Sequence, residues 1–166
     1  MIIRQIDWQD FDALHRIWGD RETMIHYPAA YSPDQTRAFI AMNIARYQHD
    51  GFGLWALIHR RDGQLIGDCG ITMQPVEDEV LPEVGYHLHR YYWGQGLATE
   101  AARACLEYAH DDLGFEQVVA IIRDLNTPSR SVAERLGMRI WKEVERAGMR
   151  HVVYESRSRR VVRPGD

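Results

Sequence analysis

Two glycines near the middle of the chain could form a binding site for phosphate. Gly94 and Gly96 join an apolar strand pattern that ends at Leu88 to a helical pattern that begins at Leu97. Such a turn leaves several backbone N–H groups without partners, and the helix dipole adds partial positive charge there. Glycine also has no Cβ to hold a bulky anion away from the main chain. The stretch therefore favours binding of a phosphate or diphosphate.

The same glycines would also suit an ordinary tight connection between a strand and a helix. A dinucleotide fingerprint is not formed, because residues 97–99 are Leu, Ala and Thr and the third glycine of G-x-G-x-x-G is missing. No Gly-Lys-Ser/Thr follows, so the nucleoside triphosphate loop does not fit either. Motifs in the second half of the chain are needed to distinguish an ordinary connection from a phosphate site.

The elements around this turn predict an α+β fold with a mixed sheet and helices on its faces. Apolar and β-branched runs predict strands over residues 2–6, 54–60, 65–73, 80–89, 117–122, 138–145 and 149–157. Three of these strands, 54–60, 65–73 and 80–89, form an antiparallel meander that begins with an Asp62-Gly63 hairpin signal. Helical spacing and capping residues predict helices over residues 8–18, 21–26, 33–50, 97–110 and 127–136.

Helical periodicity also predicts which side chains of the helices face the core. In the helix after the glycine turn they are Leu97, Ala98, Ala101, Ala102, Cys105, Leu106 and Ala109. In the other helices they are Trp8, Phe11, Leu14, Ile17 and Trp18, then Phe39, Met42 and Ala45, and last Val132, Ala133 and Leu136.

Length and composition fit one globular domain over residues 1–166. The chain is 45% hydrophobic and 27% charged, with a formal net charge of −4 and a pI near 6.1. This charge argues against a general nucleic-acid binder, although arginines gather in a tail, about 158–166, that we expect to fray. Without a leader pattern or a long apolar run, we expect neither secretion nor a membrane span. Cys69 and Cys105 suit core positions in a reducing cytoplasm, and the histidines form no recognisable metal set.

Three ordered motifs resemble those of the GNAT superfamily of N-acetyltransferases, in the branch of the ribosomal-protein N-terminal acetyltransferases. Residues 93–98, Trp-Gly-Gln-Gly-Leu-Ala, resemble the acetyl-CoA loop, and residues 83–86, Glu-Val-Gly-Tyr, resemble the strand before it. Residues 126–138 run from Asn-Thr-Pro-Ser to Leu-Gly-Met and are similar to the later Asn-x-x-Ser…Leu-Gly-Phe motif. The likeness spans nearly the whole chain, so it favours the phosphate site over an ordinary connection.

The resemblance implies the GNAT-like acyl-CoA N-acyltransferase fold, whose central, mostly antiparallel sheet splays beside the coenzyme. Acetyl-CoA would bind to the amides of the glycine turn, to main-chain groups of the splayed strand and to the later helix. The implied coenzyme-binding residues are Tyr86, His87, Leu88, Trp93, Gly94, Gln95, Gly96, Leu97, Ala98, Thr99, Asn126 and Ser129. Arg130 or Arg135 would lie near an outer phosphate, or else on a solvated helix face.

Two residues depart from the common family pattern. Trp93 stands where the loop usually begins with Arg or Gln, so coenzyme binding would depend on backbone amides. Ala133 stands where many relatives place a tyrosine that acts as general acid. Ser129 is the candidate proton donor by resemblance, and its alternative role is a helix-start hydroxyl that bonds only to backbone.

Acetyl transfer from a thioester needs an amine that loses a proton before or during attack. Glu83 is the preferred general base, acting directly or through water, because it lies on the strand that would present the thioester. A surface ion pair is the alternative role for Glu83. His87 alternates onto the same face of the strand and is the second candidate.

The acceptor is predicted less sharply than the donor. An α-amine loses its proton at a cost roughly 3 to 4 kcal/mol lower than a lysine at neutral pH, which favours a protein N-terminus or a small primary amine. The acidic residues 77–79 could attract a cationic acceptor or could simply be solvated. Trp18, Tyr27, Tyr31 and Trp141 are available to line an acceptor pocket or to fill the core.

The leading interpretation is therefore an acetyl-CoA-dependent N-acetyltransferase, an acyltransferase without a metal, working as a monomer or homodimer. Its acceptor could also be an aminoglycoside or a polyamine. A non-catalytic acetyl-CoA sensor and a nucleotide-binding interaction domain are the alternatives from other classes.

Overall fold

A seven-stranded sheet in the order β1-β2-β3-β4-β5-β7-β6 forms the centre of the computed structural model, which describes residues 1–158. Its strands are β1 (Ile2–Gln5), β2 (Leu54–Ile58), β3 (Leu65–Val76), β4 (Glu79–Leu88), β5 (Gln117–Arg123), β6 (Arg139–Arg146) and β7 (Met149–Arg157). Every neighbouring pair is antiparallel except β4 and β5, which are parallel. The predicted α+β fold with a mostly antiparallel sheet is confirmed.

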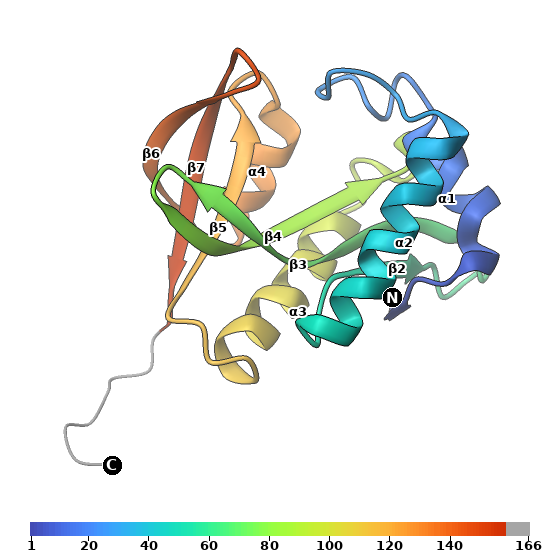
Figure 1. The fold of residues 1–166 in the computed structure, drawn as a ribbon, viewed down its shortest axis with the longest axis horizontal. Helices are drawn as coiled ribbons and strands as arrows, with labels where there is room; N and C mark the ends of the chain where they lie inside the picture. The colour runs from blue at the N-terminus through green and yellow to red at the C-terminus, as the bar shows by residue number, and fades with distance from the viewer. Residues whose placement is uncertain (159–166) are drawn as a thin grey trace.

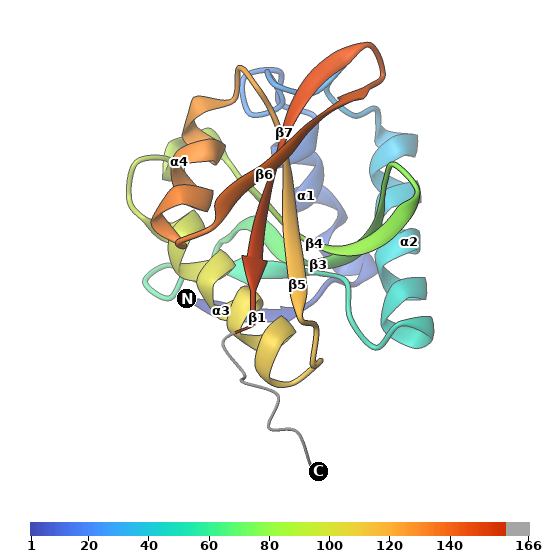
Figure 2. The ribbon, with the colours of Figure 1, turned by 90° about the vertical axis from the view of Figure 1, so that its left-hand side faces the viewer.

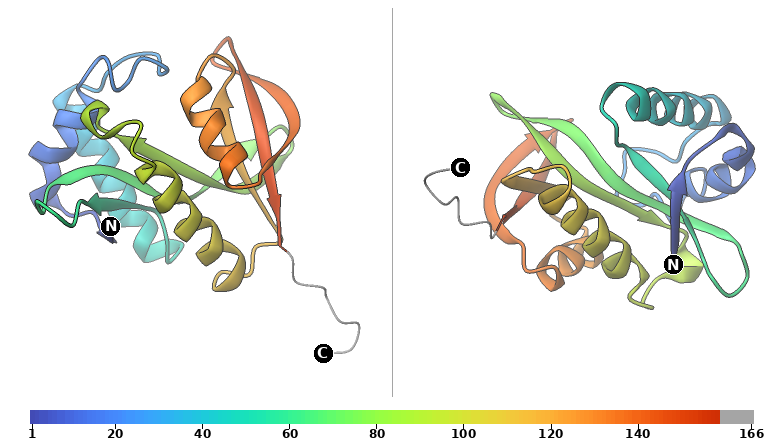
Figure 3. Two further views of the ribbon diagram at one scale, coloured as in Figure 1. Left: turned by 180° about the vertical axis from the view of Figure 1, so that it is seen from behind. Right: turned by 90° about the horizontal axis from the view of Figure 1, so that it is seen from below.

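Four α-helices cover the two faces of this sheet. They are α1 (Phe11–Trp18), α2 (Pro33–His49), α3 (Leu97–Asp111) and α4 (Thr127–Arg135), with 3₁₀ turns η1 (Trp8–Asp10) and η2 (Arg90–Tyr92). Helices α1 and α2 lie on one face, and α3 and α4 lie on the other (Figure 3). The strands β5, β7 and β6 form a separate wing, with α4 beside it (Figure 2).

The sheet opens between β4 and β5. These two strands pair at a single position, Glu83 with Val119, and then diverge (Figure 1). By contrast, β3 and β4 are paired along ten consecutive positions. The expected splay is therefore confirmed, and it leaves one edge of the second half of β4 without a strand partner.

The predicted apolar stripe of α3 packs into the main core. Ala101, Ala102, Cys105, Leu106 and Ala109 are all buried there, against β3 and β4. Small side chains at these positions let the helix lie close to the sheet. The glycine turn at its start is thereby held near the end of β4.

Two expectations about the first fifty residues are wrong. The first helix is divided, because Asp7 caps the short turn η1 and α1 begins only at Phe11; Trp8 is 55% exposed. Residues 21–26 form turns rather than a helix. Asp20 causes part of this, since its carboxylate accepts hydrogen bonds from the backbone N–H and the hydroxyl of Thr23 and so fixes a local turn.

The inward face of α2 also differs from the prediction. Ser32 and Gln35 form the expected capping box, but Met42 and Ala45 are exposed. The buried residues are Thr36, Ile40 and Asn43, a partly polar stripe. A polar side chain can lie inside here because it replaces strand partners: Asn43 Oδ1 accepts the backbone N–H of Leu54 at 3.1 Å.

The end of the chain is described as far as Ser158, whose N–H donates to the carbonyl of Glu116 at 2.8 Å. The remainder of the expected basic tail lies outside the described residues. Within residues 1–158, no helix is long and apolar enough to cross a membrane.

Candidate active site

The turn between η2 and α3 presents a row of main-chain donors. Gly94 and Gly96 have φ angles of 73° and 78°, in the region that favours glycine. Within residues 1–158, the backbone N–H groups from Gly94 to Thr99 have no hydrogen-bond partner. A Cβ built on either glycine would meet nothing within 4 Å, so both face open space. The turn is therefore shaped to receive an anion at the positive end of α3.

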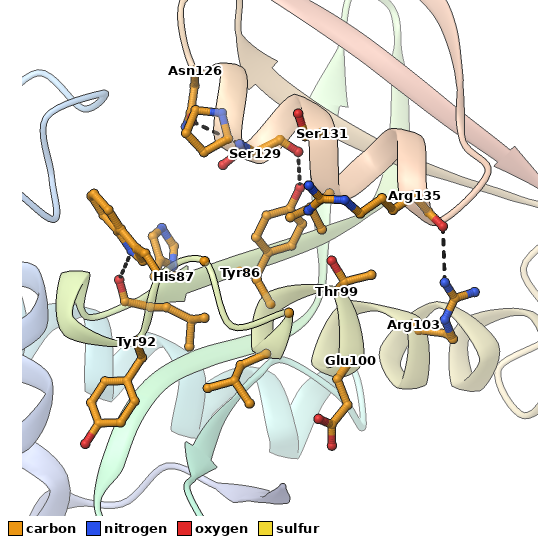
Figure 4. Close-up of a pocket in the computed structure, with 18 of the residues that line it drawn as sticks. Tyr86, His87, Tyr92, Thr99, Glu100, Arg103, Asn126, Ser129, Ser131 and Arg135 are labelled. Carbon is orange, nitrogen blue, oxygen red and sulfur yellow. Dashed lines mark hydrogen bonds between the residues drawn. The ribbon is translucent and has the colours of Figure 1, made fainter.

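A large cleft of about 1110 Å³ opens beside this turn. It is lined by the end of β4, the turn, α3 and α4, and Figure 4 shows Asn126, Ser129 and Arg135 on the side of the cleft opposite Thr99. The Thr99 hydroxyl is buried in the cleft wall without a hydrogen-bond partner in the described structure. An orphaned hydroxyl, free amides and open space beside two glycines fit an elongated ligand that carries phosphate.

The register of β3 and β4 decides which main-chain groups of β4 face the splay. His89 N–H donates to Ile66 O, so the antiparallel alternation pairs His87 with Asp68 and turns the groups of Tyr86 and Leu88 outward. The main chain of His87 therefore faces β3 while His87 still lines both cavities, and its contact with coenzyme stays a prediction. Trp93 Nε1 donates to the Leu88 carbonyl at 2.8 Å, which uses that acceptor.

The first turn of α4 forms the opposite wall of the cleft. Asn126 caps this helix, and its Oδ1 accepts the N–H of Ser129 at 3.2 Å. The hydroxyl of Tyr86 donates to the Ser129 carbonyl at 2.8 Å and so ties β4 to α4 across the splay. The Ser129 hydroxyl has no hydrogen bond within the described chain. It is thus available to a ligand, and the cap role belongs to Asn126.

A second pocket of about 320 Å³ lies toward α2 and the β6–β7 turn. Six residues line both cavities: His26, Tyr27, Tyr86, His87, Asn126 and Ser129. Glu83 lines only the smaller pocket. The two cavities therefore meet at the splay, so that two ligands can approach each other through the sheet.

Glu83 occupies the point where the β4–β5 ladder stops. Its Oε1 accepts the backbone N–H of Ile121 at 3.1 Å, a donor that a paired strand would otherwise use. Burial raises the pKa of Glu83 to about 7, against the opposing effects of the Ile121 hydrogen bond and of Arg146, His87 and Arg46. A carboxyl group with this pKa can accept a proton near neutral pH.

Comparison with known proteins assigns this arrangement to a family. The family model described as an acetyltransferase (GNAT) domain matches residues 1–139. The chain belongs to the GNAT acetyltransferase family. The sequence resemblance is thereby confirmed, and acetyl-CoA is the acetyl donor that the family uses.

Individual relatives of this GNAT chain agree over most of its length. The protein YkkB of Bacillus subtilis strain 168 is 34% identical over 142 residues, which cover 86% of this chain and 83% of YkkB. An acetyltransferase structure from Agrobacterium tumefaciens has a TM-score of 0.82 and 25% identity, covering 94% of this chain and 90% of that one. RimL, a ribosomal L7/L12 alpha-N-protein acetyltransferase in complex with coenzyme A, shares the fold, with a TM-score of 0.78, 18% identity and coverage of 94% and 93%.

Arginines stand at the outer end of the GNAT cleft. Arg135 lines it, as one of the two alternatives predicts, together with Arg103, whose Nη2 donates to the Arg135 carbonyl at 3.1 Å. Arg130 does not line the cleft; it bonds to the hydroxyl of Tyr154 and the carbonyl of Asp124. The sequence did not indicate Arg103 as a cleft residue, because it lies in the middle of α3, where helical periodicity predicts only that it is on the solvated face.

A hydrogen-bonded chain that runs from the buried Asp68 to the exposed Tyr27 supports His87. Its Nδ1 lies 2.8 Å from Oδ1 of the buried Asp68, and its Nε2 lies 2.6 Å from the hydroxyl of Tyr27. Burial lowers the pKa of His87, but the charge and hydrogen bond of Asp68, with Glu83, outweigh it and raise the pKa above 6.5. Both ring nitrogens are therefore engaged.

Sequence reasoning missed Asp68, and it left the tryptophans open between lining a pocket and filling the core. Trp18 is buried in the core, where its Nε1 donates to Asp68 Oδ2 at 2.8 Å, and Trp141 lines neither cavity. Tyr27 and Tyr31 do line the smaller pocket. An aspartate in the middle of an apolar strand was the available signal for Asp68, because a buried carboxylate needs partners.

Proposed function

We propose that the protein transfers the acetyl group of acetyl-CoA directly to a primary amine, on a protein N-terminus or a small molecule. The meeting of the two cavities at the splay carries this proposal. The larger cleft, with its free amides, suits the coenzyme, and the smaller pocket, which contains Glu83, suits the amine. Direct transfer requires both ligands to reach one point.

The main chain would hold the coenzyme. The amides of residues 94–99 would bind the diphosphate, and Arg103 and Arg135 would attract an outer phosphate. The unpaired edge of β4, through Tyr86 and the N–H of Leu88, would receive the pantetheine arm like an added strand. Acetyl-CoA supplies an acetyl group activated as a thioester, and edge N–H groups near its carbonyl would stabilise negative charge that develops on the oxygen.

Glu83 would act as the general base, directly or through one water. It lies on the amine side of the splay, and its pKa of about 7 matches neutral operation. The other candidate, His87, is engaged at Nδ1 by Asp68 and at Nε2 by Tyr27, so we assign it a positioning role. It would hold Tyr27 at the junction of the cavities.

Ser129 would donate a hydrogen bond to the departing thiolate and relay to it a proton from solvent water, which restores the serine hydroxyl. It lines both cavities, and no described residue uses its hydroxyl. The role suggested by resemblance is thus supported by a hydroxyl that is not spent on capping α4.

Release of free coenzyme A thiol tests the enzyme against the non-catalytic alternative. The purified protein is mixed with acetyl-CoA and a panel of peptides, amino acids, polyamines and aminoglycosides, and acetylated products are identified by mass spectrometry. We expect at least one amine to raise thiol release and to gain one acetyl group. If acetyl-CoA binds but no amine raises thiol release or gains an acetyl group, the coenzyme-sensor alternative is favoured. A Tm shift with NAD or ATP, but not with acetyl-CoA, would favour a nucleotide-binding domain.

A further inference from the structure

The smaller pocket is rich in positive charge. Three arginines line it, each from a different element: Arg46 from α2, Arg123 from β5 and Arg146 from β6. Glu83 is the single carboxylate among its described lining residues. With its pKa near 7, Glu83 is only partly ionised at neutral pH, so it cannot balance three guanidinium groups.

These arginines lack acidic partners in the described structure. No carboxylate oxygen lies within 4.0 Å of any of them, although Arg4, Arg90 and other arginines of the chain do form ion pairs. Arg146 donates to the carbonyl of Pro75, and Arg46 has one long contact of 3.4 Å with Asn43 Oδ1. The carbonyl of Arg123 accepts the N–H of Asn126 at 2.9 Å, but its guanidinium group forms no hydrogen bond or ion pair within residues 1–158.

Strand alternation explains why the two arginines on strands, Arg123 and Arg146, point to one side of the sheet. Arg123 follows Ile121 on β5, and Arg146 follows Val144 on β6, each two residues along and so on the same face. Ile121 and Val144 pack in one small cluster, and Ile121 lines the smaller pocket together with Glu83. Half-buried guanidinium groups on this face gain most from a ligand that supplies negative charge.

The charge of Arg123 also reaches deep into the pocket. Burial lowers the pKa of His26, and the charge of Arg123 lowers it further. His26 lines both cavities, so the charge of Arg123 acts on a residue that faces both ligands. A second cationic group on the acceptor would be repelled beside Arg123.

We propose that the acceptor is a small amine that also carries an anionic group, a carboxylate or a phosphate, bound by Arg46, Arg123 and Arg146 while its amine faces Glu83. The inference rests on the proposed function and narrows its acceptor. A volume of about 320 Å³ is at the low end for ligand pockets and suits a small molecule. Polyamines and aminoglycosides, which carry several cations, are then poor substrates.

Matched acceptor pairs test the proposal. Each amino acid in a panel is compared with its own carboxamide, which keeps the amine and removes the negative charge. We expect kcat/KM to favour the acid at least 10-fold and to fall as salt concentration rises. Equal or better use of the carboxamides would overturn the inference while leaving the acetyltransferase intact. Failure of every amine would instead remove the proposed function beneath it.

Two further arms identify the source of the negative charge. Aminoalkyl phosphates test phosphate against carboxylate, and short peptides with an acidic second residue test a protein N-terminus against a free small molecule. Preference for either anion supports the proposal. Preference for peptides over all small acids, independent of the second residue, contradicts it.

A variant pair locates the effect. Arg123→Gln should lower the ratio of kcat/KM for acid over carboxamide about 10-fold, mainly through the KM of the acid, with the KM of acetyl-CoA unchanged. Arg139→Gln is the matched control, because Arg139 is exposed on β6 and lines neither cavity. Arg123→Glu should reverse the preference toward acceptors with a second cation. If Arg123→Gln lowers kcat/KM equally for the acid and the carboxamide while the Tm is unchanged, Arg123 does not bind the negative group of the acceptor.

Discussion

The two cavities that meet at the splay are built from different materials. The larger cleft, which we propose for the coenzyme, depends on the main chain: free amides of residues 94–99 and the unpaired edge of β4. The smaller pocket depends on side chains from α2, β4, β5 and β6, including Glu83 and the three arginines. A site made of main-chain groups keeps its ligand when side chains are substituted, provided that the glycines of the turn keep their conformation. A side-chain site can change its ligand by substitution.

Replacing Glu83 should have the largest effect on this contrast. Glu83→Gln can still accept the N–H of Ile121 but cannot take a proton, so kcat/KM should fall about 10²- to 10⁴-fold. The dissociation constant for acetyl-CoA, measured by calorimetry, should stay the same. Glu79→Gln is the control, since Glu79 is exposed on the same strand. Equal losses in both variants would rule out the base assignment.

A glycine pair tests the main-chain side. Gly96→Ala should raise the dissociation constant of acetyl-CoA roughly 10- to 100-fold, because a Cβ would enter the anion space and the left-handed backbone costs roughly 1–2 kcal/mol. Gly114→Ala carries the same conformational cost, with a φ of 74° and open space around its Cβ, but Gly114 lies outside the cleft. Calorimetry on both separates strain from binding. Matching losses in the two variants would attribute the effect to folding alone.

Glu83 should also make the protein less stable as pH rises. Its folded pKa, about 7, lies above its ordinary value of 4.5, so the folded state holds the proton more tightly. Its stability contribution is highest below pH 4.5 and declines between about 4.5 and 7. Glu83→Gln should therefore be more stable than the wild type at pH 8, by on the order of 1 to 3 kcal/mol after allowing for partial exposure. Urea unfolding at pH 8 and pH 4.5 measures this, and a constant difference at both pH values would contradict it.

Ser129 should give the smallest effect. Ser129→Ala should lower kcat about 10-fold, because water can replace the hydroxyl as donor, while Ser129→Thr should keep most of the rate. Steady-state kinetics at saturating acetyl-CoA measures both. Identical rates for the alanine variant and the wild type would leave Ser129 without a chemical role.

The same contrast explains what the sequence could predict. The glycine turn and the α3 stripe depend on local residue spacing, and the splay was expected from motifs that follow one another along the chain. Such features can be predicted from a single sequence. The shape of the turn at Gly94 and Gly96 was therefore anticipated, whereas the register that directs the main chain of His87 toward β3 was not. Register depends on the pairing with β3, which a single strand does not specify.

The acceptor side could not be predicted in the same way. Arg46, Arg123 and Arg146 are far apart in sequence, and the local sequence around each one predicts only an exposed, solvated side chain. Asp68, which holds both His87 and Trp18, contributes through contacts across elements. Hydrophobic periodicity predicted the wrong inner face of α2 for the same reason. The buried Asn43 is stable there because its Oδ1 accepts the N–H of Leu54, which is distant in sequence. Contacts between distant segments become visible only in the fold.

Amide resonances of the glycine turn give the most direct test of the central claim that free main-chain donors hold the coenzyme. ¹⁵N–¹H spectra are recorded while acetyl-CoA is titrated into the protein. The N–H signals of residues 94–99 should move downfield with a shared dissociation constant, and that of Gly114 should stay in place. Saturable binding of acetyl-CoA that leaves the 94–99 signals unmoved would contradict the account.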